Sequence, residues 1–498
     1  MKKIILLLTL AAFTMSCEDF LTQDPIDQLG ESSFYTTDDE IDMAMIAAYN
    51  GLQSCMEYEW LLTEVRSDNA RINTPNTTST SSKTIITMDA LTVETTHTDN
   101  EAYWEANYHN IANCNTVLDN IEVVSDSTLK IQLEGEAKFL RAYHYFNMVR
   151  LYGPLFLVTE RIGIDEANTM ERSSVEDVYT QIESDLLDAA DLLPTSYDDD
   201  EKGRATQWAA KTLLAKVYLT LEDYESAETL LEDVEDYSGH RLLDSYDDVF
   251  DINNELNDEI IFAVTYLKGG YGLGSPFANY FAAKNASTDY ISYSGDGYNC
   301  PTYSLYTAYE DGDERRDVTV ANTFVNKSGN TVSGNNVLKY YSSVTTQYDA
   351  ENDWPVLRFA DVYLMLAEVK LKLDGVEAAL PYLNYTHERA GLLPYDSDDI
   401  PDALTCQFAI EDERRLEFAM ENQRFFDLVR TGRFITVMDE HFENELIYES
   451  GGDLVSAYTD DSYAIYMADR TVEPWQLLLP VPYSVLSVDT EAAQNPGY

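Results

Sequence analysis

Residues 206–234 read TQWAAKTLLAKVYLTLEDYESAETLLEDV, and this stretch decides the fold. Apolar residues recur at intervals of three and four over 206–221 and again over 224–234, a spacing that predicts two amphipathic helices. Residues 357–373 and 376–390 repeat this arrangement later in the chain. Because only a short turn separates the helices of each pair, we expect two antiparallel helix hairpins.

Alanines occupy matching places in the two hairpins. Ala215 and Ala227 lie twelve residues apart, one on each helix, and so do Ala367 and Ala379. Small side chains let two antiparallel helices approach closely, which is the packing principle of tetratricopeptide-type repeats. We therefore predict a mainly α fold with tetratricopeptide-like helix pairs as its scaffold.

The rest of the chain combines further helices with long irregular stretches. Periodic apolar patterns predict helices at 101–123, 129–152 and 174–193. Trp104 and Trp208 fall within helical segments, so we expect them in the core. Strand patterns are few, the best being 259–266 and 477–482, and the segments 73–100 and 268–309 are rich in polar or tyrosine residues without a regular period. Long loops of this kind often carry function.

The N-terminus has the features of an export signal. Residues 1–17 read MKKIILLLTLAAFTMSC, with Lys2 and Lys3 before an apolar core that is too short for a membrane span of about 20 residues. We predict that a signal peptidase removes residues 1–16 and that a lipid anchor is attached to the thiol of Cys17. The alternative is an ordinary cleaved signal that happens to contain a cysteine.

Charge and cysteine usage exclude several classes of site and partner. The chain carries 89 acidic and 32 basic side chains, a formal net charge of −57. Such a surface repels nucleic acid, so we expect no nucleic-acid partner. The cysteines other than Cys17 are widely separated, and no Cys/His motif has zinc spacing. We expect no cofactor.

Two acidic turns could hold structural calcium. They are Asp311-Gly312-Asp313 and the segment 198–201. Neither belongs to a 12-residue EF-type loop, and a solvated turn is the simpler interpretation of each.

Several segments together resemble the SusD/RagB family of outer-membrane nutrient-binding lipoproteins of Bacteroidetes. The matching motifs run through the whole chain in order. They are 17–21 (CEDFL), 134–153 (EGEAKFLRAYHYFNMVRLYG), 203–206 (GRAT), 357–368 (LRFADVYLMLAE), 413–418 (ERRLEF), 424–430 (RFFDLVR), 479–482 (LPVP) and 494–498 (QNPGY). The arginines of these motifs stand beside aromatics and carboxylates, which favours structural ion pairs over catalysis. They are Arg141, Arg358, Arg414, Arg415, Arg424 and Arg430.

The resemblance implies a lipoprotein that sits on a SusC-like TonB-dependent transporter, facing outward from the outer membrane. It also implies a single SusD-like domain over 17–498, with a helix-pair scaffold and a loop-rich half that faces the ligand. We place the scaffold at approximately 30–70, 101–235 and 355–435, and the irregular regions at approximately 71–100, 236–354 and 436–498. The implied cargo is an oligosaccharide or, in some relatives, a peptide.

The ligand site is predicted from the same resemblance. In starch-binding relatives the platform draws on the loop after an Asp-Asn segment and on an irregular region that corresponds here to 268–309. Sugar rings stack on aromatic faces while polar groups satisfy their hydroxyls. We predict a site with Tyr290, Tyr293 and Tyr298 as stacking residues and Asn69 and Arg71 as polar partners. The alternative is that these tyrosines only pack the loop.

Specificity and activity stay open at this point. The 73–100 loop contains no aromatic residue, which puts starch in doubt and leaves peptides and acidic glycans as candidates. A secreted glycoside hydrolase is a second hypothesis, since its two carboxylates need only lie about 5–5.5 Å apart. However, no catalytic motif accompanies the 89 acidic residues. A scaffold that organises envelope partners is the third hypothesis. Because no catalytic motif is present, we predict a non-catalytic binding protein.

Overall fold

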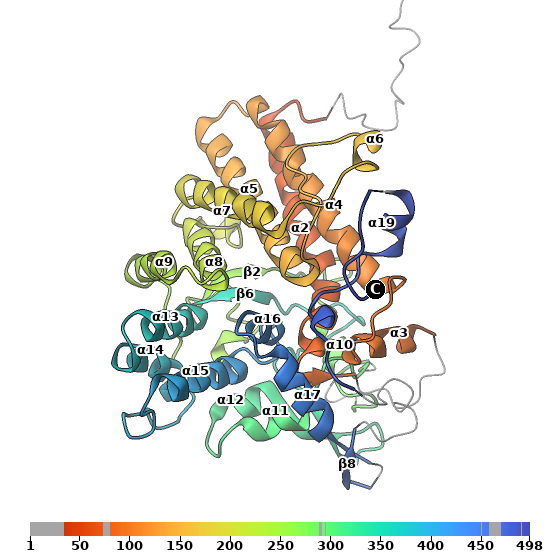
Figure 1. Ribbon diagram of the computed structural model, residues 1–498, viewed down its shortest axis with the longest axis vertical. Helices are drawn as coiled ribbons and strands as arrows, with labels where there is room; N and C mark the ends of the chain where they lie inside the picture. Colours follow the sequence, from red (N-terminus) through yellow and green to blue (C-terminus); the bar gives the residue numbers. More distant parts are fainter. Residues whose placement is uncertain are drawn as a thin grey trace, which may run out of the picture.

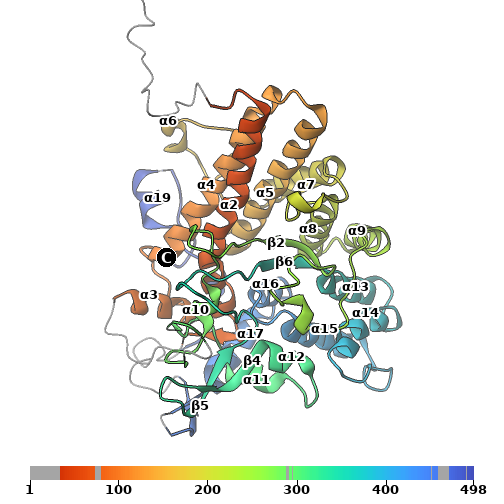
Figure 2. The same ribbon diagram turned by 180° about the vertical axis from the view of Figure 1, so that it is seen from behind.

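The computed structural model (Figures 1 and 2) has a mainly helical architecture, as predicted. It describes residues 34–72, 80–287, 291–293, 295–449, 451–457, 470–489 and 491–498. The signal segment, Cys17 and Tyr290 lie outside the described residues. No helix in the described part of the chain has both the length and the apolar character needed to cross a bilayer.

Long helices from the first part of the chain form one end of the molecule (Figure 1). They are α2 (Asp38–Leu62), α4 (Thr98–Asp119), α5 (Ser127–Tyr152) and α7 (Val175–Leu192). Consecutive helices pack on one another, α2 on α4, α4 on α5 and α5 on α7. Ser174 caps α7 by accepting a hydrogen bond from the Asp177 N–H at 3.1 Å, the arrangement expected of an N-cap serine.

The two helix hairpins predicted from the sequence are present. They are α8 (Gln207–Thr220) with α9 (Tyr224–Tyr237), and α13 (Phe359–Leu373) with α14 (Val376–Arg389). Helix α9 packs on α13, so the two hairpins lie side by side at one edge of the molecule although they are far apart in the chain (Figure 1).

The four alanines singled out in the sequence lie in the core. Ala215, Ala227, Ala367 and Ala379 are all fully buried, and α8 packs on α9 as α13 packs on α14. Their burial is consistent with close packing of the helices in each hairpin. The second hairpin begins slightly later than predicted, because residues 357 and 358 belong to a strand.

The remaining helices are mostly short. They are α3 (Thr80–Asp89), α6 (Ile164–Ala167), α10 (Phe277–Phe281), α11 (Tyr303–Ala308), α12 (Glu314–Thr319), α15 (Ala403–Glu417), α16 (Arg424–Arg430), α17 (Phe434–Asn444) and α19 (Tyr483–Val488). Helix α3 corrects the prediction that 73–100 is irregular. Its Thr- and Ser-rich sequence has little intrinsic helix preference, but its second half is anchored in the core through Ile86 and Met88.

Within the described ranges the strands form small two-stranded antiparallel sheets. The pairs are β1 (Ala70–Arg71) with β3 (Cys300–Pro301), β2 (Ile260–Val264) with β6 (Trp354–Arg358), β4 (Val320–Val325) with β5 (Thr331–Val337), and β7 (Leu446–Tyr448) with β8 (Leu454–Ser456). Strand β2 confirms the prediction at 259–266. Residues 478–482 form no strand.

The motif arginines form buried ion pairs, as predicted. Arg358 contacts Glu417 at 2.5 Å and Glu421 at 2.8 Å. The other pairs are Arg141 with Asp185, Arg414 with Asp361 and Asp427, Arg415 and Arg424 with Asp68, and Arg430 with Glu368. The Arg141 pair joins α5 to α7, and the other pairs connect α15, α16 and the turn after α15 to α13, to strand β6 and to Asp68 in the segment between α2 and β1. Trp104 and Trp208 are buried, which confirms their predicted place in the core.

Candidate functional site

Four aromatic side chains from three distant segments meet around α10. Tyr298 stacks on Trp60 of α2, with ring centroids 5.9 Å apart and an interplanar angle of 11°. The ring centroid of Tyr280, on α10, lies 5.9 Å from that of Tyr298 and 5.3 Å from that of Tyr348. We call Trp60, Tyr280, Tyr298 and Tyr348 the tyrosine cluster.

Backbone contacts fix the three tyrosines of the cluster relative to one another. The Tyr298 N–H donates to the Tyr280 carbonyl oxygen at 2.8 Å. Asn279, which is buried, accepts from the Tyr348 N–H through its side-chain oxygen at 2.9 Å and from the Asp296 N–H through its carbonyl oxygen at 2.9 Å. The short helix α10 therefore holds the two loops that carry Tyr298 and Tyr348.

The side chains of the cluster differ in their exposure to solvent. Trp60 is buried, whereas Tyr280 and Tyr298 are half-buried and Tyr348 is 41% exposed. Aromatic faces that are partly open to solvent can stack against the apolar C–H faces of sugar rings. The ring arrangement therefore suits a carbohydrate better than a small apolar ligand, which needs an enclosed pocket.

Carboxylates stand beside the rings as hydrogen-bond acceptors. The Tyr280 hydroxyl donates to Glu57 at 3.0 Å, and the Tyr348 hydroxyl donates to Asp296 at 3.0 Å. Burial, and then the charge of Glu57, raise the pKa of Tyr280 well above its ordinary value. Both phenols therefore stay protonated at neutral pH and remain donors.

The predicted stacking residues fall in or beside this cluster where the structure describes them. Tyr298 is a member. Tyr293 is 41% exposed, and its hydroxyl donates to the Thr345 carbonyl oxygen at 2.8 Å, which places it beside the segment that carries Tyr348. Tyr290 is outside the described residues.

The two predicted polar partners lie in the interior instead. Asn69 has no exposed surface, and its side chain donates to Glu64 at 3.0 Å and accepts from Arg415 at 2.9 Å. Arg71 lies in β1 and is 6% exposed. Both residues are buried, so their side chains are not part of the tyrosine cluster.

Trp60, Tyr280 and Tyr348 were missed by the sequence prediction. Trp60 lies in a helix whose pattern suggests core packing, and Tyr348 lies in a segment without any motif. The aromatic density of 268–309 was the available signal, and it pointed to Tyr280 only as one ring among many.

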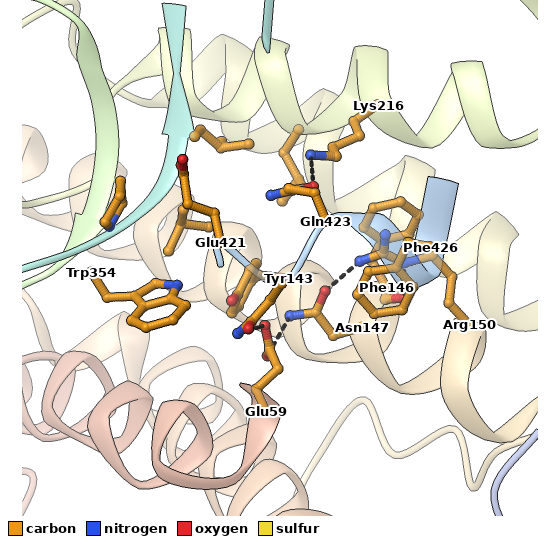
Figure 3. A pocket seen from close by; sticks show the side chains of 15 residues that line it. Glu59, Tyr143, Phe146, Asn147, Arg150, Lys216, Trp354, Glu421, Gln423 and Phe426 are labelled. Atoms are coloured by element: carbon orange, nitrogen blue, oxygen red, sulfur yellow. Dashed lines mark hydrogen bonds between the residues drawn. The ribbon is translucent and has the colours of Figure 1, made fainter. Parts of the chain in front are cut away.

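A separate polar cavity lies in the interior, between α2, α5, α8 and the segment that leads into α16 (Figure 3). Glu59 accepts from Asn147 at 3.2 Å, and Lys216 donates to Gln423 at 2.6 Å. The Arg150 guanidinium lies between the rings of Phe146 and Phe426, at 3.7 and 3.6 Å from their centroids.

This cavity is too small for a sugar. Its volume of 30 Å³ holds about two water molecules. Burial raises the pKa of Glu59 to about 7, and the charges of Arg150 and Lys216 offset only part of this effect. The cavity therefore affects the stability of the protein and does not serve as the glycan-binding site.

The acidic turns proposed for calcium differ from each other. Asp313 is buried against Arg315 at 2.9 Å, so its charge is already compensated. The turn 199–201 is exposed, and Asp199 contacts Lys202 at 3.2 Å. In the described ranges, no three His, Cys, Asp or Glu side chains are grouped so as to hold a metal ion.

Comparisons with known proteins agree with this architecture. Residues 19–219 match a family described as starch-binding and associating with the outer membrane, and residues 321–498 match the SusD family. These matches define a class of outer-membrane-associated, glycan-binding proteins. The chain belongs to the SusD/RagB family.

Individual relatives cover nearly the whole length of the chain. SusD-like protein P25 of Formosa agariphila is 25% identical, over 100% of this chain and 99% of its own. The solved structure of a laminarin-binding SusD-like protein is 26% identical, with a TM-score of 0.76 over 92% of this chain and 99% of its own. Surface glycan-binding protein A from Bacteroides thetaiotaomicron, in complex with laminarihexaose, is 20% identical and shares the fold, with a TM-score of 0.75 over 92% of this chain and 100% of its own.

Proposed function

We propose that this chain captures a glycan at the cell surface without transforming it, and hands it to a SusC-like TonB-dependent transporter. The tyrosine cluster is the observation that carries this proposal. It offers ring faces for stacking, together with Glu57 and Asp296 as acceptors for sugar hydroxyls. The similarity to a laminarin-binding protein supports a glycan as the ligand.

Anchoring through Cys17 completes the proposal. A lipid on Cys17 would hold the binding domain at the outer membrane, with its cluster available to polymers outside the cell. We expect Cys17→Ala to leave the fold intact, by circular dichroism, while the protein leaves the membrane fraction. Retention of the variant in that fraction would contradict the anchor.

Binding of glycans by the purified protein tests the central part of the proposal. Isothermal titration with neutral and anionic oligosaccharides should identify a ligand. Tyr280→Ala combined with Tyr298→Ala should then weaken its affinity at least about tenfold, since truncated aromatic anchors typically cost more than about 1 kcal/mol. Thermal unfolding would check that the double variant still folds.

Tyr385 provides a matched control. It is a 45% exposed tyrosine of α14 that packs on Tyr363 of the scaffold, with ring centroids 4.4 Å apart. Tyr385→Ala should leave glycan affinity unchanged. Equal loss in both variants, or unaltered affinity in the double variant, would contradict the assignment of the site.

The peptide alternative and the enzyme alternative have distinct signatures in the same experiments. A peptide-binding member would bind peptides and ignore all the oligosaccharides. A hydrolase would shorten its glycan during the titration, and one carboxylate substitution would abolish the cleavage. We expect neither result.

A further inference from the structure

Carboxylates accept the hydroxyl hydrogen bonds of two tyrosines of the tyrosine cluster. Glu57 accepts from the Tyr280 hydroxyl, and Asp296 accepts from the Tyr348 hydroxyl, each at 3.0 Å. We infer that the cluster selects uncharged glycans and rejects sulfated or uronic-acid polymers. This inference rests on the proposed function, and it names the class of ligand.

Asp99 adds a third negative charge near the same rings. It lies in the first turn of α4. Burial raises the pKa of Tyr298, and the charges of Asp296 and Asp99 add to that rise. Burial, and then the charge of Glu57, raise the pKa of Asp99, which indicates that the two carboxylates repel each other. Glu57 and Asp99 also act on Tyr58, next to Glu57 on α2.

Negative charge therefore exceeds positive charge around the described part of the cluster. The groups that shift the pKa values of Tyr280, Tyr298 and Tyr348 through their charge are carboxylates or other phenols. Burial raises the pKa of Asp296, and the exposed Lys284 opposes this rise and offsets part of the negative charge. His97 lies 3.9 Å from Asp99, but burial lowers its pKa to about 4, so it is neutral at pH 7.

This arrangement discriminates between glycans by charge. The hydroxyls of a neutral glycan can donate to Glu57 and Asp296, because ionised carboxylates are acceptors. A sulfate or a uronic carboxylate on the same sugar ring offers no donor and brings a like charge to the carboxylates. The net charge of −57 on the whole chain adds repulsion over longer distances at low salt.

Three oligosaccharides of similar length would test the inference by titration calorimetry with the full mature protein. They are laminarihexaose as the neutral probe, an oligoguluronate, and a sulfated carrageenan oligosaccharide. We expect the neutral probe to bind with an affinity that salt leaves nearly unchanged. Each anionic probe should bind at least tenfold more weakly at low salt, with a smaller difference at high salt as the repulsion is screened.

Charge-neutralising variants sharpen the test. Glu57→Gln, Asp99→Asn and Asp296→Asn together should reduce the discrimination against the anionic probes at least threefold. The matched control neutralises three exposed carboxylates elsewhere, with Asp165→Asn, Glu225→Gln and Glu377→Gln. It changes the net charge equally and should keep the discrimination.

The outcomes separate this inference from the proposed function. Anionic probes that bind as tightly as the neutral one, or more tightly, and lose that affinity in Tyr280→Ala with Tyr298→Ala, would overturn the inference and leave glycan capture intact. Equal effects of the local and the remote neutralisations would also overturn it. Binding of none of the glycans would overturn the proposed function and the inference with it.

Discussion

Replacing Glu59 by glutamine should remove a pH dependence from the stability of this protein. Glu59 lies in the central cavity, where burial raises the pKa of its carboxyl group from an ordinary 4.5 to about 7 (Figure 3). The folded protein therefore keeps a proton that the unfolded chain releases. At about 1.4 kcal/mol per pH unit, the difference in pKa corresponds to about 3 kcal/mol.

The sign of the effect follows from this proton. Between pH 4.5 and about 7 the folded state binds more protons than the unfolded state at Glu59, so the free energy of unfolding falls as pH rises. The stabilisation is complete below pH 4.5 and is lost once the pH passes about 7. Glutamine stays neutral throughout, and its oxygen can still accept from Asn147 and Tyr103, which donate to Glu59 in the parent at 3.2 Å each.

Urea unfolding at a series of pH values between 4.5 and 8 measures this directly. The quantity to plot is the difference in free energy of unfolding between Glu59→Gln and the parent, because other buried acids such as Glu64 and Glu445 contribute to both curves. We expect the variant to gain up to about 3 kcal/mol relative to the parent from pH 5 to pH 8. A difference that stays constant with pH would refute the reasoning.

Three further changes test the scaffold and the lipid anchor. Ala227→Leu should destabilise the protein by about 1–3 kcal/mol in urea unfolding, because Ala227 is fully buried on α9, which packs on α8 and α13; a neutral result would contradict the close packing. Glu417→Gln should cost about 3–5 kcal/mol, since this carboxylate contacts Arg358, Arg389 and Arg315 in the interior, and a loss below about 1 kcal/mol would contradict its role. Membrane fractionation of Cys17→Ala checks the lipid anchor, as described above.

The helix hairpins could be predicted from the sequence because their apolar spacing reports directly on burial. Ala215 and Ala227 carry this information locally, and the structure confirms that both are buried in a pair of packed helices. The buried ion pairs of Arg141 and Arg358 were also predictable, since a guanidinium beside carboxylates and aromatics is stable inside a protein only when it is paired.

The candidate site was less predictable because it is assembled from distant segments. Tyr298 could be found in an aromatic-rich stretch, but its stacking partner Trp60 lies more than two hundred residues earlier in the chain. Tyr348 is held at the site by hydrogen bonds to Asn279 and Asp296, and no local sequence pattern predicts such contacts. Asn69 illustrates the opposite error, since a polar residue near a predicted loop is in fact enclosed by Glu64 and Arg415.

A structure of the protein bound to the glycan that binds best in the titrations is the most direct test of the central claim. We predict that a sugar ring lies against Tyr298 or Tyr348, with hydroxyls donating to Glu57 or Asp296. A glycan found on another surface, such as the α13–α14 hairpin around Tyr385, with the tyrosine cluster unchanged, would contradict the account.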